Sequence, residues 1–166
     1  KQINLVVNWM RVGFIHGVMN TDNMSISGET IDYGPCAFMD TYDPKTVFSS
    51  IDQMGRYAYC NQPIITKWNL SRLAECLLPL IDKDQEKAIQ LATKIINSFE
   101  KKYEEKWLNM MRDKLGLFGV DEKDKFLILD LLTWMHQKKV DYTNTFCHLM
   151  NEKIKEDKNY EDEDFQ

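Results

Sequence analysis

Hydrophobic residues at the start of the chain recur with helical spacing. Leu5, Trp9 and Val12 fall three to four positions apart within residues 3–12, which places them on one face of a helix. Gly13 follows, and glycine is favoured just after a helix because it adopts positive φ without strain. We therefore expect a helix over residues 3–12 that ends at Gly13.

The pattern then changes to short apolar pieces separated by turn-forming residues. Met24–Ile26 and Thr30–Ile31 are two such pieces, and Gly28 lies between them. Short apolar segments around a glycine are typical of a β-hairpin, so we expect two short strands within residues 24–31. Residues 44–62 show no clear period and predict an ordered loop.

In the rest of the chain the helical spacing returns and persists. It predicts four further helices, over residues 63–81, 82–114, about 121–138 and about 142–155. Asn61 is expected to cap the first of them and Asp82 or Asp84 the second, because short polar side chains bond the free N–H groups at a helix start. Gly116 and Gly119 are expected to end the second helix.

Apolar residues define the inner faces of the first two of these helices. On the first, the expected core positions are Ile64, Trp68, Leu70, Leu73, Leu77 and Leu80. On the second, they are Ile89, Ala92, Ile96, Phe99, Tyr103, Trp107 and Met110. Aromatic and aliphatic residues at helical spacing belong to a core far more often than to a binding stripe. The expected fold class is mainly α, a helical bundle with a small β-hairpin.

Composition narrows the class of protein. The chain has 166 residues, of which 43% are hydrophobic and 28% charged, as in one globular domain. No stretch reaches the ~20 consecutive apolar residues of a membrane-spanning helix, so we expect no membrane contact. The 21 basic residues are outnumbered by 26 acidic ones, a formal charge of −5. This excess argues against a nucleic-acid partner, because phosphate backbones are bound by clustered basic side chains.

The cysteines and the two ends of the chain bear on its origin. Four cysteines lie far apart without a CxxC pair, which favours free thiols over a zinc or redox site. No secretory signal pattern opens the chain, so we expect a reducing, cytoplasmic setting. The sequence starts at Lys1 inside an amphipathic pattern, which suggests a piece of a longer protein. Residues 156–166 carry six acids and one lysine and predict an acidic tail or linker.

Polar residues concentrate between His16 and Gly34. Asp22, Asn23 and Asp32 provide carboxylate and carboxamide oxygens, the hard ligands that Mg²⁺ binds while leaving positions for substrate phosphates. The alternative is turn chemistry, since Asp and Asn also bond their own backbone in loops. For His16 we favour a bracing role within the loop over proton transfer.

The spacing of these residues resembles the catalytic lobe of the protein kinases. There a His-x-Asp loop is followed by an Asn seven residues after the His, and then by an Asp-Phe-Gly turn. Here Asn23 follows His16 at the same spacing, and Asp32 begins an Asp-Tyr-Gly run. Val18 stands where a kinase carries its catalytic Asp, and valine cannot accept a proton. The loop instead carries a carboxylate at Asp22, beside Asn23.

Longer runs are similar to a single family. HGVMNTDN at residues 16–23 is followed by IDYGP at 31–35, GRY at 55–57, NQP at 61–63 and WNL at 68–70. This combination closely resembles the selenoprotein O family, from about residue 8 to residue 80. Ser50 and Ile51 depart from the pattern, because the family tends to carry His-Ser there.

The resemblance implies a pseudokinase-like fold that binds ATP with Mg²⁺ and transfers AMP to Ser, Thr or Tyr hydroxyls of proteins. Carried over position by position, Asp22 looks like the proton acceptor, while Asn23 and Asp32 look like the metal ligands. Asp32 would also reach the nucleotide through the ion. The implied partners are ATP and proteins with hydroxyl side chains. Such a transfer needs a base for the hydroxyl and a cation for the phosphoryl charge.

In a kinase-like enzyme, the other lobe supplies the groups that hold the phosphates. Those groups are not found in this sequence. Its seven glycines are scattered, and no glycine-rich turn or strand lysine is recognisable. We therefore expect residues 1–155 to form a kinase-like C-terminal lobe that is inactive alone. Within it, residues 1–43 would carry the catalytic loop and hairpin, residues 44–62 a loop, and residues 63–155 the helical bundle. Two alternatives stay open: a kinase-like phosphotransferase, against which Val18 argues, and a catalytically dead helical interaction module.

Overall fold

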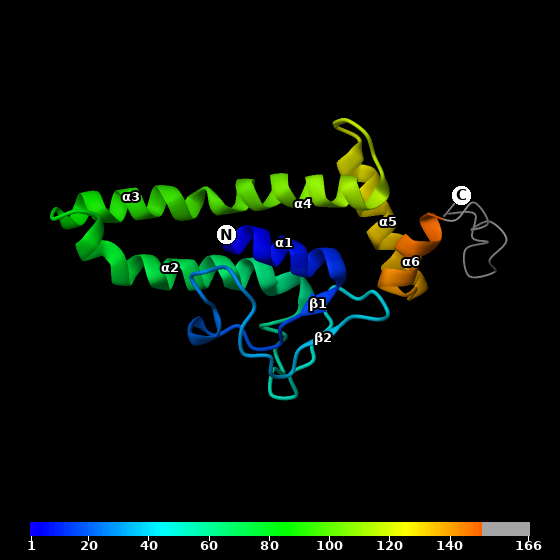
Figure 1. Ribbon diagram of the computed structural model, residues 1–166, viewed down its shortest axis with the longest axis horizontal. Coiled ribbons are helices and arrows are strands. Elements are labelled where there is room, and N and C mark those ends of the chain that lie inside the picture. Colours follow the sequence, from blue (N-terminus) through cyan, green and yellow to red (C-terminus); the bar gives the residue numbers. More distant parts are fainter. Residues whose placement is uncertain (151–166) are drawn as a thin grey trace.

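The computed structural model describes residues 1–150 and is mainly helical, which confirms the expected class (Figure 1). Its helices are α1 (Gln2–Val12), α2 (Gln62–Ile81), α3 (Gln85–Asn97), α4 (Phe99–Leu115), α5 (Asp124–Lys138) and α6 (Tyr142–Leu149). Two strands, β1 (Phe14–Ile15) and β2 (Ala37–Phe38), and two 3₁₀ turns, η1 (Thr21–Asn23) and η2 (Tyr59–Asn61), complete the described part. The end of the last expected helix and the acidic tail at 156–166 lie outside the described residues.

The helices form two long rows with α1 packed between them. Figure 1 shows α3 and α4 following one another in one row and α2 running alongside them. Helix α1 packs against both α4 and α2, while α2 packs against α3. The strands and the long loops lie on the other side of α1 from α4, and α5 and α6 lie at one end (Figure 1). No helix among residues 1–150 is long and apolar enough to span a membrane.

The C-terminus of α1 is closed by a glycine and two tyrosines. Gly13 has φ 69 and ψ 21, the left-handed conformation, and its N–H bonds back to Trp9 and Met10 carbonyls. The hydroxyls of Tyr59 and Tyr142 both donate to the Met10 carbonyl oxygen, at 2.7 and 2.8 Å. The predicted helix end at Gly13 is therefore confirmed, and the last turn of α1 is held at the centre of the core.

The predicted hairpin within residues 24–31 is wrong. The antiparallel pair is β1 with β2, in the register Phe14 to Phe38 and Ile15 to Ala37. In residues 24–31, polar groups instead form hydrogen bonds within a local turn and with α1. Ser25 accepts the Gly28 N–H at 3.1 Å, and the Trp9 indole N–H donates to the Thr30 hydroxyl at 2.9 Å.

Most helices start and end close to the residues that the sequence predicts. Asp84 caps α3 by accepting hydrogen bonds from the N–H groups of Glu86 and Lys87. It is one of the two residues that were expected to cap this helix. The expected single helix over 82–114 is divided at Ser98, whose hydroxyl bonds back to the Ile95 carbonyl at 2.7 Å. Serine competes with the backbone for hydrogen bonds in this way. Asn61 precedes α2 without a capping bond; its amide donates to the Gly55 carbonyl at 2.7 Å.

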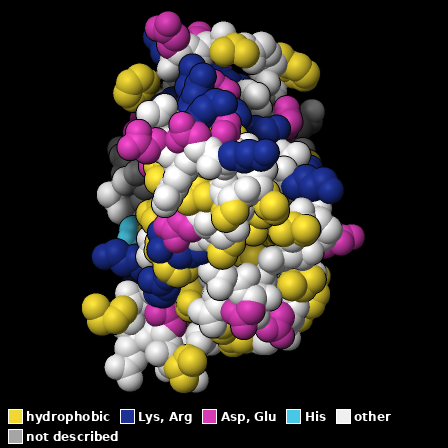
Figure 2. Space-filling model, turned by 90° about the vertical axis from the view of Figure 1, so that its left-hand side faces the viewer, with side chains coloured by type: hydrophobic (Ala, Val, Ile, Leu, Met, Phe, Trp, Pro, Cys, Tyr) yellow, Lys and Arg dark blue, Asp and Glu magenta, His cyan; other side chains and the backbone are white. Residues whose placement is uncertain are grey.

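The expected inner face of α2 is also wrong. Most of its members are more than a third exposed: Ile64, Trp68, Leu73, Leu77 and Leu80. The buried residues of α2 are Gln62, Pro63, Ile65, Thr66 and Asn69. On α3 and α4 the expected face holds at Ala92, Phe99 and Met110, whereas Ile89 is exposed. Figure 2 looks onto the end where α2 meets α3 and shows hydrophobic side chains at the surface among charged ones.

Candidate active site

His16 is a buried brace between two parts of the polar loop. It follows β1 directly and is 1% exposed. Its ring Nε2 lies 2.8 Å from the Ile31 carbonyl oxygen, which ties the loop after β1 to the residue before Asp32. Its backbone N–H donates to the Gln62 side-chain oxygen at 3.0 Å. These contacts confirm the bracing role that the sequence favoured for His16.

Gln62, the first residue of α2, fixes the backbone of β1. Its side chain is completely buried; the amide oxygen accepts from His16 and the amide nitrogen donates to the Phe14 carbonyl at 2.9 Å. A buried amide whose donor and acceptor are both used in this way specifies one arrangement of the segments it joins. Gln62 thereby sets the direction in which the chain leaves β1 toward Asp22.

Pro35, directly after the Asp-Tyr-Gly run, lies against Gly17 at the start of the same loop. A Cβ on Gly17, whose φ is 84, would meet the Pro35 carbonyl oxygen at 3.0 Å and the Pro35 ring at 3.1 Å. Only glycine allows this approach without a shift of the backbone. Together with the His16 bond, it joins the loop after β1 to Ile31 and Pro35, the residues on either side of the Asp32–Gly34 run.

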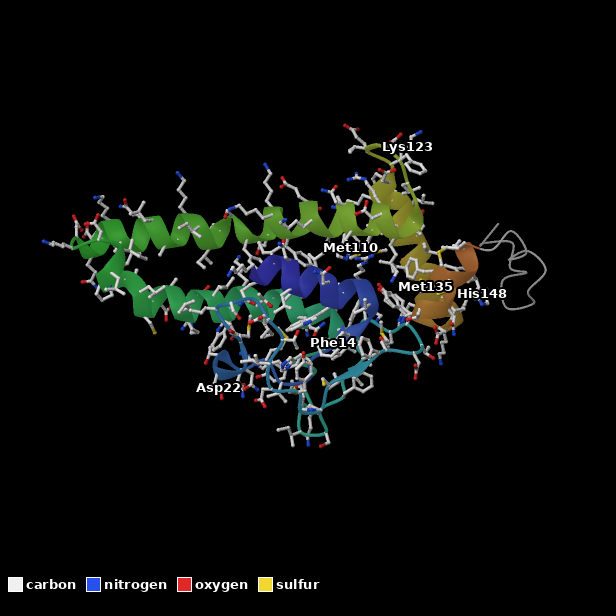
Figure 3. The ribbon with its side chains drawn as sticks, viewed as in Figure 1. Phe14, Asp22, Met110, Lys123, Met135 and His148 are labelled. Atoms are coloured by element: carbon white, nitrogen blue, oxygen red, sulfur yellow. The ribbon has the colours of Figure 1, made fainter. Side chains whose placement is uncertain are left out.

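Asp22 and Asn23 lie together on η1, with Asp22 exposed and Asn23 partly buried. Figure 3 shows Asp22 in the loop layer, with Met110 on the other side of α1. The Asn23 amide nitrogen donates to the Val18 carbonyl at 3.0 Å. This bond uses the amide nitrogen. The amide oxygen, which is the atom that binds cations, takes no part in it.

Two side chains from distant segments hold η1 in place. Asn69, buried on α2, donates to the Met19 carbonyl at 3.0 Å. The Tyr57 hydroxyl donates to the Asn20 side-chain oxygen at 2.5 Å. In the sequence, Asn69 and Tyr57 stand out only as parts of the WNL and GRY runs. The positioning role of Asn69 was missed, because a polar residue on a helix is ordinarily assigned to solvent. The role of Tyr57 was missed because its partner Asn20 lies 37 residues away in the sequence.

Asp32 has an uncommon backbone conformation. Its φ is 56, and it is one of two non-glycine residues with positive φ among those described. Its carbonyl accepts the Gly34 N–H at 2.8 Å, so the backbone reverses within the Asp-Tyr-Gly run. Asp tolerates this region better than most residues, and such conformations concentrate at functional turns. The side chain of Asp32 is exposed.

Backbone contacts join the loop that leads to Asp22 and Asn23 to the segment that carries Asp32, through His16 with Ile31 and Gly17 with Pro35. Within residues 1–150, no hydrogen bond joins the side chains of Asp22, Asn23 and Asp32. No group of three or more His, Cys, Asp and Glu side chains in this part of the chain is placed to hold a metal. The predicted set contains two carboxylates and one carboxamide. Such a set fits Mg²⁺, which keeps several waters and takes further oxygens from substrate phosphates.

Comparison with known proteins identifies the family. A sequence model described as "Protein adenylyltransferase SelO" matches residues 1–165. "Protein nucleotidyltransferase YdiU" of Pelagibacter ubique is 71% identical over 165 residues, which are 99% of this chain and 34% of that protein. The proteins of the same name from Alcanivorax borkumensis and Nitrosococcus oceani are 60% and 58% identical, over 34% and 33% of their lengths. The chain spans about a third of the length of these relatives; it belongs to the SelO family.

Proposed function

We propose that the protein to which this chain belongs transfers AMP from ATP to hydroxyl groups of proteins. The printed names of the relatives describe protein nucleotidyltransferases, and the name of the family describes adenylyl transfer. The observation that carries the proposal is the braced loop. Gln62 holds the His16 backbone at the end of β1, and His16 and Gly17 contact Ile31 and Pro35, the residues on either side of Asp32–Gly34.

The reaction assigns a separate task to each polar residue. Asp22 accepts the proton of the attacking hydroxyl, which adds to the α-phosphorus of ATP as pyrophosphate leaves with the electrons of the broken P–O bond. Asn23 and Asp32 would hold Mg²⁺, which supplies charge stabilisation at the phosphoryl oxygens. Val18 takes no part in proton transfer. The reaction forms one phosphodiester bond and breaks one phosphoanhydride bond.

The test of the reaction type uses the full-length protein with ATP and Mg²⁺. Intact-mass spectrometry of the acceptor identifies the group attached, and ATP labelled at the α- or at the γ-phosphate identifies its origin. The proposal requires attachment of AMP with retention of the α-label. Transfer of the γ-label would instead establish a kinase-like phosphotransferase. A protein that attaches neither group in these assays would be the catalytically dead module.

Removing the Asp32 carboxylate should slow the reaction strongly without unfolding the protein. In the full-length protein, Asp32→Ala is expected to lower the rate of AMP transfer by about a hundredfold or more, because one metal ligand is lost. Asp130→Ala, an exposed carboxylate on α5, is the matched control and should retain the wild-type rate. Circular dichroism checks both folds. A folded Asp32→Ala protein with full activity would exclude the metal role.

The 166-residue chain alone should be inactive. It contains no recognisable glycine-rich turn or strand lysine for the phosphates, and kinase-like transfer depends on those contacts. We expect no labelled AMP on a mixture of acceptor proteins after incubation with the isolated chain, while the full-length protein labels them under the same conditions. AMP transfer by the isolated chain would show that all required groups lie within residues 1–166.

A further inference from the structure

Two arginines flank one tryptophan beside the candidate active site. The Arg56 guanidinium carbon lies 5.0 Å from the Trp68 ring centroid, and the Arg72 guanidinium carbon lies 5.2 Å from it. Trp68 and Arg72 are one turn apart on α2, whereas Arg56 comes from the loop between β2 and η2. Trp68 is 42% exposed, and both arginines are exposed as well. We call these three side chains the Arg–Trp–Arg row.

Both ends of the row adjoin the residues that precede Asp22. At one end, Tyr57 follows Arg56 and donates its hydroxyl hydrogen to Asn20 at 2.5 Å. At the other end, Arg72 and Thr21 line the same cavity of about 390 Å³. The row therefore runs beside the segment that carries the proposed proton acceptor, on the open surface of the molecule.

The two arginines differ in what they already bind. Arg72 pairs with Glu75 at 2.6 Å. Within residues 1–150, Arg56 makes no ion pair; its guanidinium contacts only the rings of Tyr57 and Trp68. The nearby Asp52 carboxylate instead accepts the backbone N–H groups of Arg56 and Tyr57, both at 2.8 Å.

A cation–π contact leaves a guanidinium ready for a ligand. The Arg56 guanidinium carbon lies over the indole ring, and this contact uses none of the N–H donors, so they stay free to form two parallel bonds to a carboxylate. The contact with the indole also restricts the long side chain before any ligand arrives, which reduces the entropy lost on binding. Arg56, which lies over the indole and makes no ion pair within residues 1–150, is thus suited to bind an acidic side chain.

We propose that the Arg–Trp–Arg row binds an Asp or Glu side chain of the acceptor protein, close to the hydroxyl that receives AMP. This inference rests on the proposed function and names its substrate class: acceptor sites with an acidic neighbour. Arg56 supplies the free guanidinium, Trp68 supplies the surface on which it lies, and Arg72 adds positive charge at the cavity beside Thr21.

The test compares two peptides with the full-length protein. Each has a single serine, flanked by Glu and Asp in one peptide and by Gln and Asn in the other. We expect kcat/KM for AMP transfer to be about fivefold higher for the acidic peptide, the range of exposed ion pairs. Arg56→Gln should bring the ratio close to one without changing KM for ATP, and Arg56→Lys should retain part of the preference.

Arg11→Gln is the matched control, because Arg11 is an exposed arginine on α1 and lines a different groove, between α1 and α4. It should keep the full preference for the acidic peptide. Equal rates for both peptides in the wild type, or an unchanged ratio in Arg56→Gln, would overturn the proposal. A raised KM for ATP in Arg56→Gln would also overturn it and assign the guanidinium to nucleotide phosphates. AMP transfer that lacks acidic preference refutes this inference alone, whereas absence of AMP transfer refutes the proposed function with it.

Discussion

Gly13 meets two separate requirements at one position. Its φ of 69 is left-handed, and a Cβ there would lie 3.0 Å from the Tyr142 ring. Gly116, at the end of α4, has φ 67, but nothing lies within 4 Å of a Cβ built on it. The sequence predicted both glycines as helix ends. Only the tertiary structure distinguishes them, because the Tyr142 contact comes from a residue far along the chain.

The two glycines give a matched pair of stability measurements. Gly116→Ala should lower the free energy of unfolding by about 1 kcal/mol, the cost of a left-handed alanine. Gly13→Ala should lower it by about 2–3 kcal/mol, because the tyrosine ring must also shift. Urea denaturation of the two variants measures the difference. Equal losses would mean that the Tyr142 contact at Gly13 is relieved without cost.

At the scale of elements, α2 shows where the sequence pattern misleads. Its bounds were predicted within a residue, because Pro63 and the helical spacing identify them. Its buried face was predicted wrongly, because apolar residues were expected there, whereas Gln62 and Asn69 are polar. These two amides are buried since they bond the carbonyls of Phe14 on β1 and of Met19 in the loop that follows it. A hydrophobic pattern does not encode a helix face that is held by hydrogen bonds to the backbone of other segments.

Substitution of Gln62 tests how strongly α2 holds β1. Gln62→Leu is expected to lower the free energy of unfolding by about 3 kcal/mol, because the buried His16 N–H and Phe14 carbonyl lose their partners. Gln90→Leu, at an exposed position on α3, should change it by no more than about 0.5 kcal/mol. Thermal and urea unfolding measure both. A Gln62→Leu protein as stable as the Gln90→Leu control would show that the buried amide is dispensable.

For the whole molecule, Lys114 connects three helices. From α4 it donates to the Arg11 carbonyl of α1, and its ammonium lies 4.2 Å from the Tyr142 ring centroid and 4.0 Å from that of Phe146, both on α6. Burial, with a smaller contribution from the Arg11 charge, lowers the pKa of Lys114 to about 8. Burial raises the pKa of Tyr142 to about 12 and also raises the pKa values of Tyr42, Tyr59 and Tyr103.

These opposite shifts predict a maximum in stability at alkaline pH. Between pH 8 and the ordinary lysine pKa of 10.5, the folded chain holds fewer protons at Lys114 than the unfolded chain, so the free energy of unfolding rises with pH. Above the ordinary tyrosine pKa of 10.0, the folded chain holds more protons at the tyrosines, so stability falls. Urea denaturation from pH 7 to about 11 measures the profile.

Substitution isolates the lysine contribution to that profile. Lys114→Met keeps most of the apolar stem and should reduce the rise between pH 8 and 10. Lys106→Met, at an exposed position on the same helix, should leave the rise unchanged. If the wild type and Lys114→Met run parallel through this range, the pKa of Lys114 is not lowered in the folded protein.

The sequence by itself determined the helical class, most helix bounds, the family, and the loop that contains Asp22, Asn23 and Asp32. These properties depend on local spacing, on glycines at helix ends and on short motifs, all of which are written in contiguous residues. The tertiary structure alone decided that β1 pairs with β2 rather than residues 24–31 with themselves. It also decided that Gln62 and Asn69 are buried, and that Arg56 and Arg72 meet at Trp68. Each of these features joins residues distant in sequence through hydrogen bonds or ring contacts, and such contacts form only when the packed helices bring the segments together.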